Sequence, residues 1–494
     1  MLKIDDLMAA SGVKFGTSGA RGRVSDMTDT VCFAYALGFL QYLRSAGRLA
    51  AGRDVGIAGD YRPSTGRIMA ACAAAVLAAG CRPRNYGRIP APALAAHGIA
   101  RGVPTMMVTG SHIPDDRNGI KFNRPSGEIL KDDEAGIRAQ TLELPAGAFA
   151  ADGSLLQPPV LPPAESGALE AYVSRYLAFF PRDWLAGLKV GLYEHSSVAR
   201  DAFHAVLTGL GAKVTRLGRA DCFIPVDTEA IRPEDVELAR GWAASGDFDA
   251  LVSADGDGDR PLIADAEGHW LRGDIAGILC ARELGAAGVV TPVSSNTAVE
   301  RCGWFQEVLR TRIGSPYVIA GMQALRERGL APVVGYEANG GFLIETDIAR
   351  DSRRLAALPT RDAVIVAVTI LGAARRRGMP VAGLTAQLPE RFTDSDRIGD
   401  FPTELSAQRL AAFATGDAAA DRAAAAAVFG PAFGEVTAVD HTDGVRIGFA
   451  NGEIAHLRPS GNAPELRAYT EADSAKRARD MNRICMDILN GWRG

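Results

Sequence analysis

The feature that most constrains the fold is an alternation of short apolar strands with helical segments that recurs three times. It first occurs between residues 54 and 123, in the order DVGIA, the Ala-rich STGRIMAACAAAVLAAG, and PTMMVTG. It returns in LKVGLY, VARDAFHAVLTGLG and FDALVSADGDGDR, and again in GVVTPVSS, SPYVIAGMQALRERG and APVVGYEANGG. This rhythm predicts α/β units on parallel sheets, with functional loops at the carboxyl ends of the strands.

Linker signals divide the chain into four segments. At 494 residues it is too long for one hydrophobic core. Pro-rich and Gly/Pro-rich stretches at 156–167 and 377–383 separate units. The last hundred residues combine an Ala-rich helical tract, a hairpin with an Asn-Gly turn, a further strand and a final helix, which is an α+β pattern. We expect three consecutive α/β domains of similar topology and one α+β domain, over residues 1–165, 166–268, 269–380 and 381–494.

Composition and charge exclude several classes of partner. Hydrophobic residues make up 47% and charged residues 23%, and the formal net charge is −4, so no basic field for nucleic acid is present. The apolar runs 68–80 and 363–374 are too short for membrane helices and predict buried helices. The acidic N-terminal stretch does not resemble a signal peptide, and the seven cysteines contain no C-x-x-C pair. We expect a cytoplasmic protein with reduced cysteines and a small-molecule partner.

The strongest chemical signal is SADGDGDRP, in which Asp255, Asp257 and Asp259 alternate with glycines just after an apolar strand. Three carboxylates this close repel one another unless they hold a hard divalent cation. An EF-hand would need Gly and Glu where the chain has Arg260 and Ala266, so that interpretation fails. The alternative is an acidic surface turn. Three protein oxygens leave open positions for a phosphate, which suits Mg2+.

A second segment, MMVTGSHIPDDRNGIKFNRPSG, places Ser111 after a strand and beside His112, with Lys121 ten residues on. A nucleophile elbow would have Gly at position 113, where this chain has Ile113, so acyl transfer is disfavoured. A lone Ser in a turn is more often a turn residue than a nucleophile. The His112 and Lys121 neighbours favour a nucleophile here.

The segment HLRPSGNAPELRAY combines groups that can hold a phosphate from several directions, or alternatively forms a solvated hairpin connection. These groups are Arg458, Ser460, Gly461, Asn462 and Arg467. Two weaker segments are VKFGTSGARG, with Arg21 on a Gly-rich loop, and GYEANGG, where Glu337 and Asn339 could take a pair of sugar hydroxyls. No Walker A or dinucleotide-binding glycine motif is present in the sequence.

Taken in order from Phe15 to Tyr469, these five segments resemble the α-D-phosphohexomutase superfamily. That resemblance implies three α/β domains and an α+β domain around a central cleft. It implies Mg2+-dependent phosphoryl transfer between O1 and O6 of a hexose, with hexose 1,6-bisphosphate as intermediate and activator. The partner would be a hexose phosphate, with no nucleic acid and no membrane, and the protein a monomer or homodimer.

The resemblance also assigns roles to residues. TGSHIP would carry the phosphoserine at Ser111, which would hold Mg2+ together with the three aspartates. Arg21, His112, Lys121 and Arg260 would lie at the reacting centre, with His112 and Lys121 as general acid/base candidates. RPSGNAP would grip the phosphate that is not reacting, and a third-domain loop would contribute Arg312 and Gly314.

The sugar loop departs from the family pattern. Many members read Glu-x-Ser-Gly-His, where this chain reads Glu337-Ala338-Asn339-Gly340-Gly341. The resemblance favours a phosphomannomutase, then a phosphoglucomutase, and leaves phosphoglucosamine mutase as an alternative. A bisphosphate synthase or phosphatase using the same phosphoserine and a non-catalytic sugar-phosphate sensor are the remaining alternatives.

Overall fold

The structure is a computed structural model that describes residues 1–460 and 464–493. The chain divides into two compact units. The larger unit comprises Met1–Val289 and Ser315–Thr385, and the smaller unit comprises Val290–Gly314 and Ala386–Gly494. Four larger sheets follow one another along the chain, as the sequence pattern predicts, and the third contains the boundary of the units within strand β14 (Gly288–Pro292).

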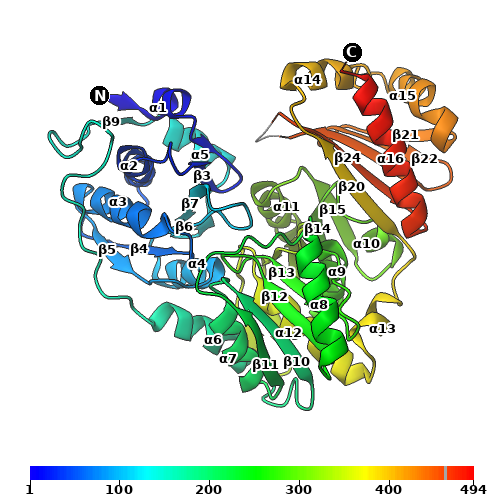
Figure 1. The fold of residues 1–494 in the computed structure, drawn as a ribbon, viewed down its shortest axis with the longest axis horizontal. Helices are drawn as coiled ribbons and strands as arrows, with labels where there is room; N and C mark the ends of the chain where they lie inside the picture. Colours follow the sequence, from blue (N-terminus) through cyan, green and yellow to red (C-terminus); the bar gives the residue numbers. More distant parts are fainter. Residues whose placement is uncertain (461–463, 494) are drawn as a thin grey trace. The chain divides into compact units, whose positions relative to one another are not determined.

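The first sheet belongs to the larger unit and has the strand order β2-β3-β7-β6-β4-β5, with β8 paired to β7 (Figure 1). Strands β4 and β6 are parallel, as are β4 and β5, whereas β7 runs antiparallel to both β6 and β3. The strands are β2 (Lys14–Phe15), β3 (Gly19–Arg23), β4 (Asp54–Gly59), β5 (Arg82–Asn85), β6 (Thr105–Val108), β7 (Arg117–Arg124) and β8 (Gly127–Glu128).

Helices and a two-stranded ribbon complete this region. Helix α2 begins after Thr28, whose hydroxyl accepts a hydrogen bond from the backbone N–H of Val31. The Ala-rich α3 is the buried helix predicted from the apolar run 68–80. The helices are α1 (Ile4–Ser11), α2 (Asp29–Ser45), α3 (Thr65–Ala78), α4 (Ala91–Arg101) and α5 (Lys131–Arg138), and the ribbon pairs β1 (Leu2–Lys3) with β9 (Thr141–Leu142).

The second sheet has the order β11-β10-β12-β13, in which β10 is parallel to β11 and β12 while β13 is antiparallel to β12. The aspartate motif is therefore the turn of a β12–β13 hairpin. The elements are α6 (Gly167–Phe179), β10 (Lys189–His195), α7 (Arg200–Gly209), β11 (Lys213–Arg219), α8 (Pro233–Ser245), β12 (Ala250–Ala254) and β13 (Pro261–Ala264).

The third region of the larger unit contains an antiparallel pair and a helix that is buried over its first three turns. Strands β16 (Val333–Tyr336) and β17 (Phe342–Ile344) pair across the turn that holds Glu337. Helix α12 (Ala363–Arg377) is buried from Ala363 to Ala374, because its sequence is apolar on all faces. The remaining elements are α9 (Gly273–Glu283), α11 (Ser315–Glu327), β18 (Ile348–Arg350), β19 (Arg353–Leu355) and α13 (Val381–Thr385).

The smaller unit contains a five-stranded antiparallel sheet in the order β20-β24-β23-β22-β21. The predicted hairpin is present, with the left-handed Gly452 (φ 81°) in the turn between β22 and β23. The elements of this unit are α10 (Ala298–Arg301), β15 (Glu307–Thr311), β20 (Phe392–Ile398), α14 (Thr403–Ala411), α15 (Ala418–Phe433), β21 (Val436–Asp440), β22 (Val445–Phe449), β23 (Ile454–Pro459), β24 (Leu466–Ala472) and α16 (Ala475–Gly491).

A buried carboxylate joins the first and third regions of the larger unit. Glu128 on β8 is 4% exposed and accepts hydrogen bonds from the hydroxyls of Ser315 (2.8 Å) and Thr360 (2.6 Å). Because a buried carboxylate is costly without such partners, these two bonds fix the start of α11 and the loop before α12 to the first sheet.

Two expectations from the sequence are corrected. The α/β sheets are not purely parallel, because each α/β region ends in a strand that returns antiparallel as a hairpin: β7, β13 and β17. Arg21 lies on strand β3, not on a loop, because β3 pairs with β7. Lys121 lies on β7, which continues the sheet by pairing with both β3 and β6.

The cysteines are free, five of them are buried, and no helix in the described part of the chain has the length and apolarity needed to span a bilayer.

Each of the four predicted segments contains one of the larger sheets, and we propose these segments as domains.

Candidate active site

Ser111 lies in a strained turn between β6 and β7. It has a left-handed backbone (φ 59°), which is uncommon for a residue with a side chain, and it is 1% exposed. Its backbone N–H donates to the Thr109 hydroxyl at 2.8 Å. Such strain persists only when surrounding contacts hold it, and here it directs the Ser111 hydroxyl into the aspartate loop.

Arg62 supplies most of those contacts. It is fully buried, and its guanidinium donates to the carbonyls of Ser111 (3.1 Å), Ile113 (2.5 Å), Pro114 (2.6 Å) and Arg117 (2.9 Å). Its Nε is ion-paired with Asp60 Oδ2 at 3.1 Å. Arg62 therefore clamps the whole Ser111 loop, a role that its sequence context does not reveal.

The hydroxyl of Ser111 donates to Oδ2 of Asp255 at 2.5 Å. The other Asp255 oxygen accepts from the backbone N–H groups of Asp259 (3.1 Å) and Arg260 (3.2 Å), which closes the turn. A Cβ on Gly256 would lie 2.7 Å from the Ser111 carbonyl oxygen, so only glycine permits this approach of the two loops. The fold therefore brings together the two segments that carry the strongest chemical signals in the sequence.

The three aspartates fit a divalent cation. Asp255, Asp257 and Asp259 are buried and offer carboxylate oxygens that all lie within 4.8 Å of one another. Oδ1 of Asp257 and Oδ1 of Asp259 are buried without a hydrogen-bond partner among the described residues. Burial, followed by the charges of Asp257 and Asp259, raises the pKa of Asp255 well above its ordinary value. Hard oxygen ligands with unsatisfied lone pairs are the donor set that Mg2+ takes.

Two side-chain cations partly balance these carboxylates. Lys121 Nζ bonds Asp257 Oδ2 at 2.6 Å and Asp259 Oδ2 at 2.5 Å, and Arg361 Nε donates to Asp259 Oδ2 at 3.0 Å. Burial alone would lower the pKa of Lys121, but the two carboxylates raise it. Burial would likewise raise the pKa of Asp259, and Arg361, then Lys121, holds it well below its ordinary value. Lys121 is therefore protonated and Asp259 ionised.

His112 is held as a neutral imidazole. Arg260 donates from Nη1 to His112 Nδ1 at 2.8 Å, and Ser111 Oγ lies 3.3 Å from the same nitrogen. Burial, then the charges of Arg260 and Arg21, lowers the pKa of His112 well below its ordinary value. A neutral imidazole can accept a proton, but Arg260 occupies the Nδ1 lone pair, so Nδ1 becomes a base toward the Ser111 site only when that bond is released.

Arg21 remains available for a ligand. Burial, followed by the charge of Arg260, lowers its pKa to about 10. Within residues 1–460 and 464–493 its side chain has no hydrogen bond or ion pair, although the charges of Asp257 and Arg260 act on it. An unpaired guanidinium among these groups suits an anionic ligand.

The sugar loop is a tight turn between β16 and β17. Glu337 is 4% exposed, and its Oε2 accepts from Arg361 Nη1 at 3.2 Å. Asn339 uses its Oδ1 to accept from the backbone N–H of Gly341 at 3.0 Å. Glu337 thus belongs to the same cluster as the aspartates through Arg361, whereas the Asn339 oxygen is engaged within the turn.

The predicted phosphate loop belongs to the smaller unit. Arg458 on β23 is ion-paired with Asp443 at 2.9 Å, and Arg467 on β24 with Glu465 at 2.9 Å. The Ser460 backbone N–H donates to the carbonyl of Glu465 at 2.8 Å. Gly461 and Asn462 lie outside the described residues.

The third-domain loop lies against the turn between β21 and β22 within the smaller unit. Arg312 Nε donates to the carbonyl of Thr442 at 3.1 Å, and the backbone N–H of Ile313 donates to Asp443 at 2.9 Å. Gly314 has a positive φ of 129°, which favours glycine. Asp443 therefore connects this loop with Arg458.

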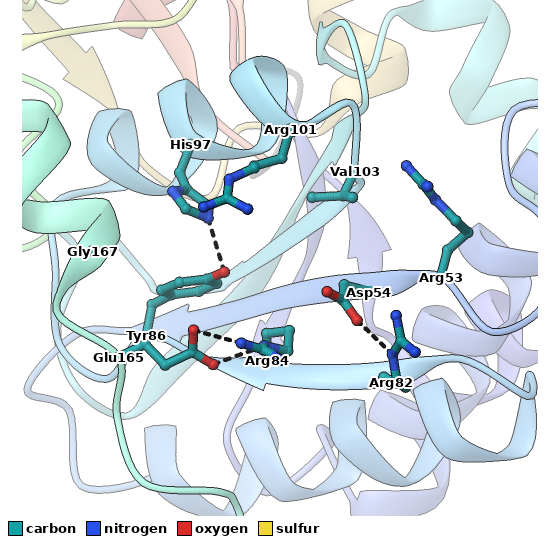
Figure 2. A pocket seen from close by; sticks show the side chains of 10 residues that line it. All are labelled: Arg53, Asp54, Arg82, Arg84, Tyr86, His97, Arg101, Val103, Glu165 and Gly167. Atoms are coloured by element: carbon teal, nitrogen blue, oxygen red, sulfur yellow. Dashed lines mark hydrogen bonds and ion pairs between the residues drawn. The ribbon is translucent and has the colours of Figure 1, made fainter.

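A surface pocket of about 270 Å³ lies elsewhere in the larger unit (Figure 2). It borders the amino ends of β4 and β6 and extends along β5 as far as Tyr86, whereas Ser111 follows the carboxyl end of β6. The side chains drawn there pair with one another as Arg82 with Asp54, Arg84 with Glu165, and Tyr86 with His97 (Figure 2). This pocket is separate from the candidate active site.

Three models of phosphoglucomutase/phosphomannomutase domains match the chain: alpha/beta/alpha domain I over residues 12–146, alpha/beta/alpha domain III over 272–392, and the C-terminal domain over 407–488. The phosphomannomutase of Salmonella muenchen is 43% identical over 474 residues, which cover 96% of this chain and 95% of that protein. The chain belongs to the phosphoglucomutase/phosphomannomutase family.

Other members of the family are similar to different degrees. The phosphomannomutase of Sinorhizobium fredii is 43% identical, with 97% of this chain and 99% of that protein covered. A phosphoglucosamine mutase of Gluconacetobacter diazotrophicus is 30% identical over 74% of this chain and 79% of its own. The structure of a putative phosphomannomutase from Thermus thermophilus superposes with a TM-score of 0.74 at 18% identity, covering 97% of this chain and 99% of that one, which shows a shared fold.

Proposed function

We propose that this phosphohexomutase interconverts mannose 1-phosphate and mannose 6-phosphate through a phosphoserine at Ser111. The observation that carries the proposal is the Ser111 hydroxyl, held 2.5 Å from Asp255 within a cluster of three buried aspartates. A non-catalytic sensor would need neither a nucleophile nor an acidic cluster. The 43% identity to curated phosphomannomutases, against 30% to a phosphoglucosamine mutase, supports mannose phosphates as substrates.

Mg2+ is the metal that we assign to this site. Asp255, Asp257 and Asp259 would hold it together with a phosphoserine oxygen. When bound, it would supply positive charge that stabilises the transferring phosphoryl group. The unpartnered oxygens of Asp257 and Asp259 support this assignment.

In the proposed step, the P–O bond to Ser111 Oγ breaks as a P–O bond forms to a sugar hydroxyl oxygen. The hydroxyl proton passes to a base, for which neutral His112 is suited, and protonated Lys121 is suited to supply the proton that Ser111 Oγ gains. Arg21 and Arg260 would balance the phosphoryl charge. The resulting hexose 1,6-bisphosphate returns its other phosphoryl group to Ser111, so that both ends of the sugar use one site.

Two further loops complete the proposal. Glu337 and Asn339 would bind sugar hydroxyls. Arg458, Ser460, Gly461, Asn462 and Arg467, with Arg312 and Gly314 from the neighbouring loop, would hold the phosphate that is not reacting. Guanidinium groups match a phosphate through paired N–H donors, which supports this assignment.

The experiment is a 31P NMR time course with Mg2+ and a trace of hexose 1,6-bisphosphate on mannose, glucose and glucosamine 1-phosphates. We expect mannose 1-phosphate to be converted fastest, and Ser111→Ala to abolish conversion while the exposed-site control Ser25→Ala retains it. Conversion by Ser111→Ala at the wild-type rate would refute the phosphoserine. Release of inorganic phosphate or net bisphosphate as main product would favour a phosphatase or synthase instead.

A further inference from the structure

Arg361 occupies an unusual place for an arginine. It lies in the loop between β19 and α12, immediately before Asp362, whose carboxylate caps α12 by accepting from the backbone N–H groups of Val364 and Ile365. Its side chain is 3% exposed. Because Asp362 fixes the loop to the helix, the backbone of Arg361 is held in place on its carboxyl side.

The guanidinium of Arg361 joins two functional loops. Its Nε donates to Asp259 Oδ2 at 3.0 Å in the aspartate loop, and its Nη1 donates to Glu337 Oε2 at 3.2 Å in the sugar loop. Both carboxylates are buried, and the cation between them offsets their mutual repulsion. Asp259 also bonds Lys121, whereas Arg361 is the side-chain donor to Glu337. The rigid planar fork of arginine fixes both carboxylates at once, which a lysine point charge does not do.

Gly341 provides the space for this arginine. A Cβ at position 341 would lie 2.6 Å from Arg361 Cδ and 2.7 Å from Cγ, closer than real Cβ atoms come to a neighbour. The backbone of Gly341 is not in the left-handed region, so conformation does not require glycine there. A residue larger than glycine at position 341 would therefore clash with the Arg361 side chain where it now lies.

We propose that Arg361 is a positioning residue for sugar recognition, and that residue 341 is glycine because Arg361 needs its space. Arg361 holds the Glu337 carboxylate in a fixed place relative to the aspartate loop, where it accepts hydrogen bonds from substrate hydroxyls. At position 341 the sugar loop departs from the family pattern. The buried Arg361 accounts for this departure, because its side chain fills the space that a larger residue at 341 would need. The inference rests on the proposed function, since it concerns the same sugar site.

The test compares kcat/KM for mannose 1-phosphate with kcat/KM for its 2-, 3- and 4-deoxy analogues. In the wild type, we expect the analogue lacking the hydroxyl bound by Glu337 to react about 10- to 100-fold less efficiently, as for a hydrogen bond to a charged group. In Arg361→Ala this penalty should fall below about 3-fold, because a displaced Glu337 no longer distinguishes the analogues. An unchanged penalty in Arg361→Ala would overturn the inference.

Gly341→Ala tests the shared space independently. It should reproduce the reduced penalty of Arg361→Ala, and the double variant should be no worse than Arg361→Ala, since truncation removes the clashing atoms. If the losses of kcat/KM in the two single variants simply added in the double variant, the two residues would not compete for the same space, and the inference would be refuted. Arg354→Ala, at a largely exposed arginine paired with Asp347, is the matched control and should keep the wild-type penalty.

Two outcomes separate this inference from the proposed function. If the wild type converts none of the hexose 1-phosphates, the proposed function fails. The second outcome begins with a wild type that converts mannose 1-phosphate. Arg361→Lys retains the positive charge and so supports folding. If this variant still shows the full loss of kcat/KM with the deoxy analogue, the inference fails while the proposed function stands.

Discussion

Replacing Arg62 by methionine should test how the strained turn at Ser111 is held. The substitution keeps an unbranched side chain of similar reach but removes the four bonds to the carbonyls of the Ser111 loop and the ion pair with Asp60. Arg62 and Asp60 are both fully buried. Without the guanidinium, the buried Asp60 carboxylate would have no positive charge beside it. Its remaining side-chain hydrogen bonds would come from the hydroxyls of Thr65 and Thr109.

Breaking a buried ion pair from one side costs roughly 3–5 kcal/mol, and each carbonyl left buried without a donor adds up to about 1–3 kcal/mol where water cannot enter. We therefore expect Arg62→Met to lower the free energy of unfolding by at least about 3 kcal/mol. The Ser111 turn should also relax from its left-handed conformation, which would lower kcat by more than about tenfold.

Urea titrations give the first quantity and steady-state kinetics the second. Arg62→Lys keeps the charge but not the fork, so it should recover part of the stability and little of kcat. Arg53→Met, at an exposed arginine of the same region, serves as control and should change unfolding by less than about 0.5 kcal/mol. A loss below about 1 kcal/mol in Arg62→Met, with unchanged kcat, would refute the clamp.

Three further outcomes are expected. Gly256→Ala would place a Cβ 2.7 Å from the Ser111 carbonyl oxygen, so it should lower the free energy of unfolding by about 1–3 kcal/mol and remove most of the activity. The control is Gly66→Ala, at a helix position with no atom near the added Cβ, which should be neutral or slightly stabilising in the same urea titrations. Asp257→Asn should weaken Mg2+ binding measured by calorimetry at least tenfold, and unchanged affinity would remove Asp257 from the metal site. Burial lowers the pKa of His456 to about 4 in the folded chain. Between about pH 6.5 and 4 the unfolded chain therefore binds a proton at this histidine that the folded chain does not. The free energy of unfolding should fall across this range as the pH drops, by up to about 3 kcal/mol. His456→Gln should show a shallower dependence of unfolding on pH, and an identical one would contradict this.

Local sequence signals were sufficient for many of the strands and helices and for the loops after β6 and β12 that carry the chemistry. The apolar stretches at 54–59 and 250–254 form strands β4 and β12, and the loops that follow β6 and β12 carry Ser111 and Asp255. These features depend on short-range periodicity and on residue types whose chemistry has few other uses. The Asn-Gly turn at 451–452 was predictable for the same reason.

Features that depend on distant partners were not predictable. Arg62 contacts loop carbonyls about fifty positions away, and Arg361 pairs with Asp259 across 102 positions. Neither arginine has a distinctive local motif. Strand β7 was missed because RNGIKFNR mixes polar and apolar residues without clear alternation, and its pairing with β3 and β6 decides its structure.

The division of the smaller unit into two stretches of chain has a consequence for synthesis on the ribosome. Thr297 donates through its backbone N–H and its hydroxyl to the carboxylate of Glu471, which follows 174 positions later. At about 5–20 residues per second, the segment 290–314 must wait roughly ten to thirty-five seconds for that carboxylate. Residues 315–385, which complete the larger unit, emerge during this interval. The order of translation therefore lets the unit with the aspartate cluster close first, while the stretch beginning at Val290 stays without its final partner until late.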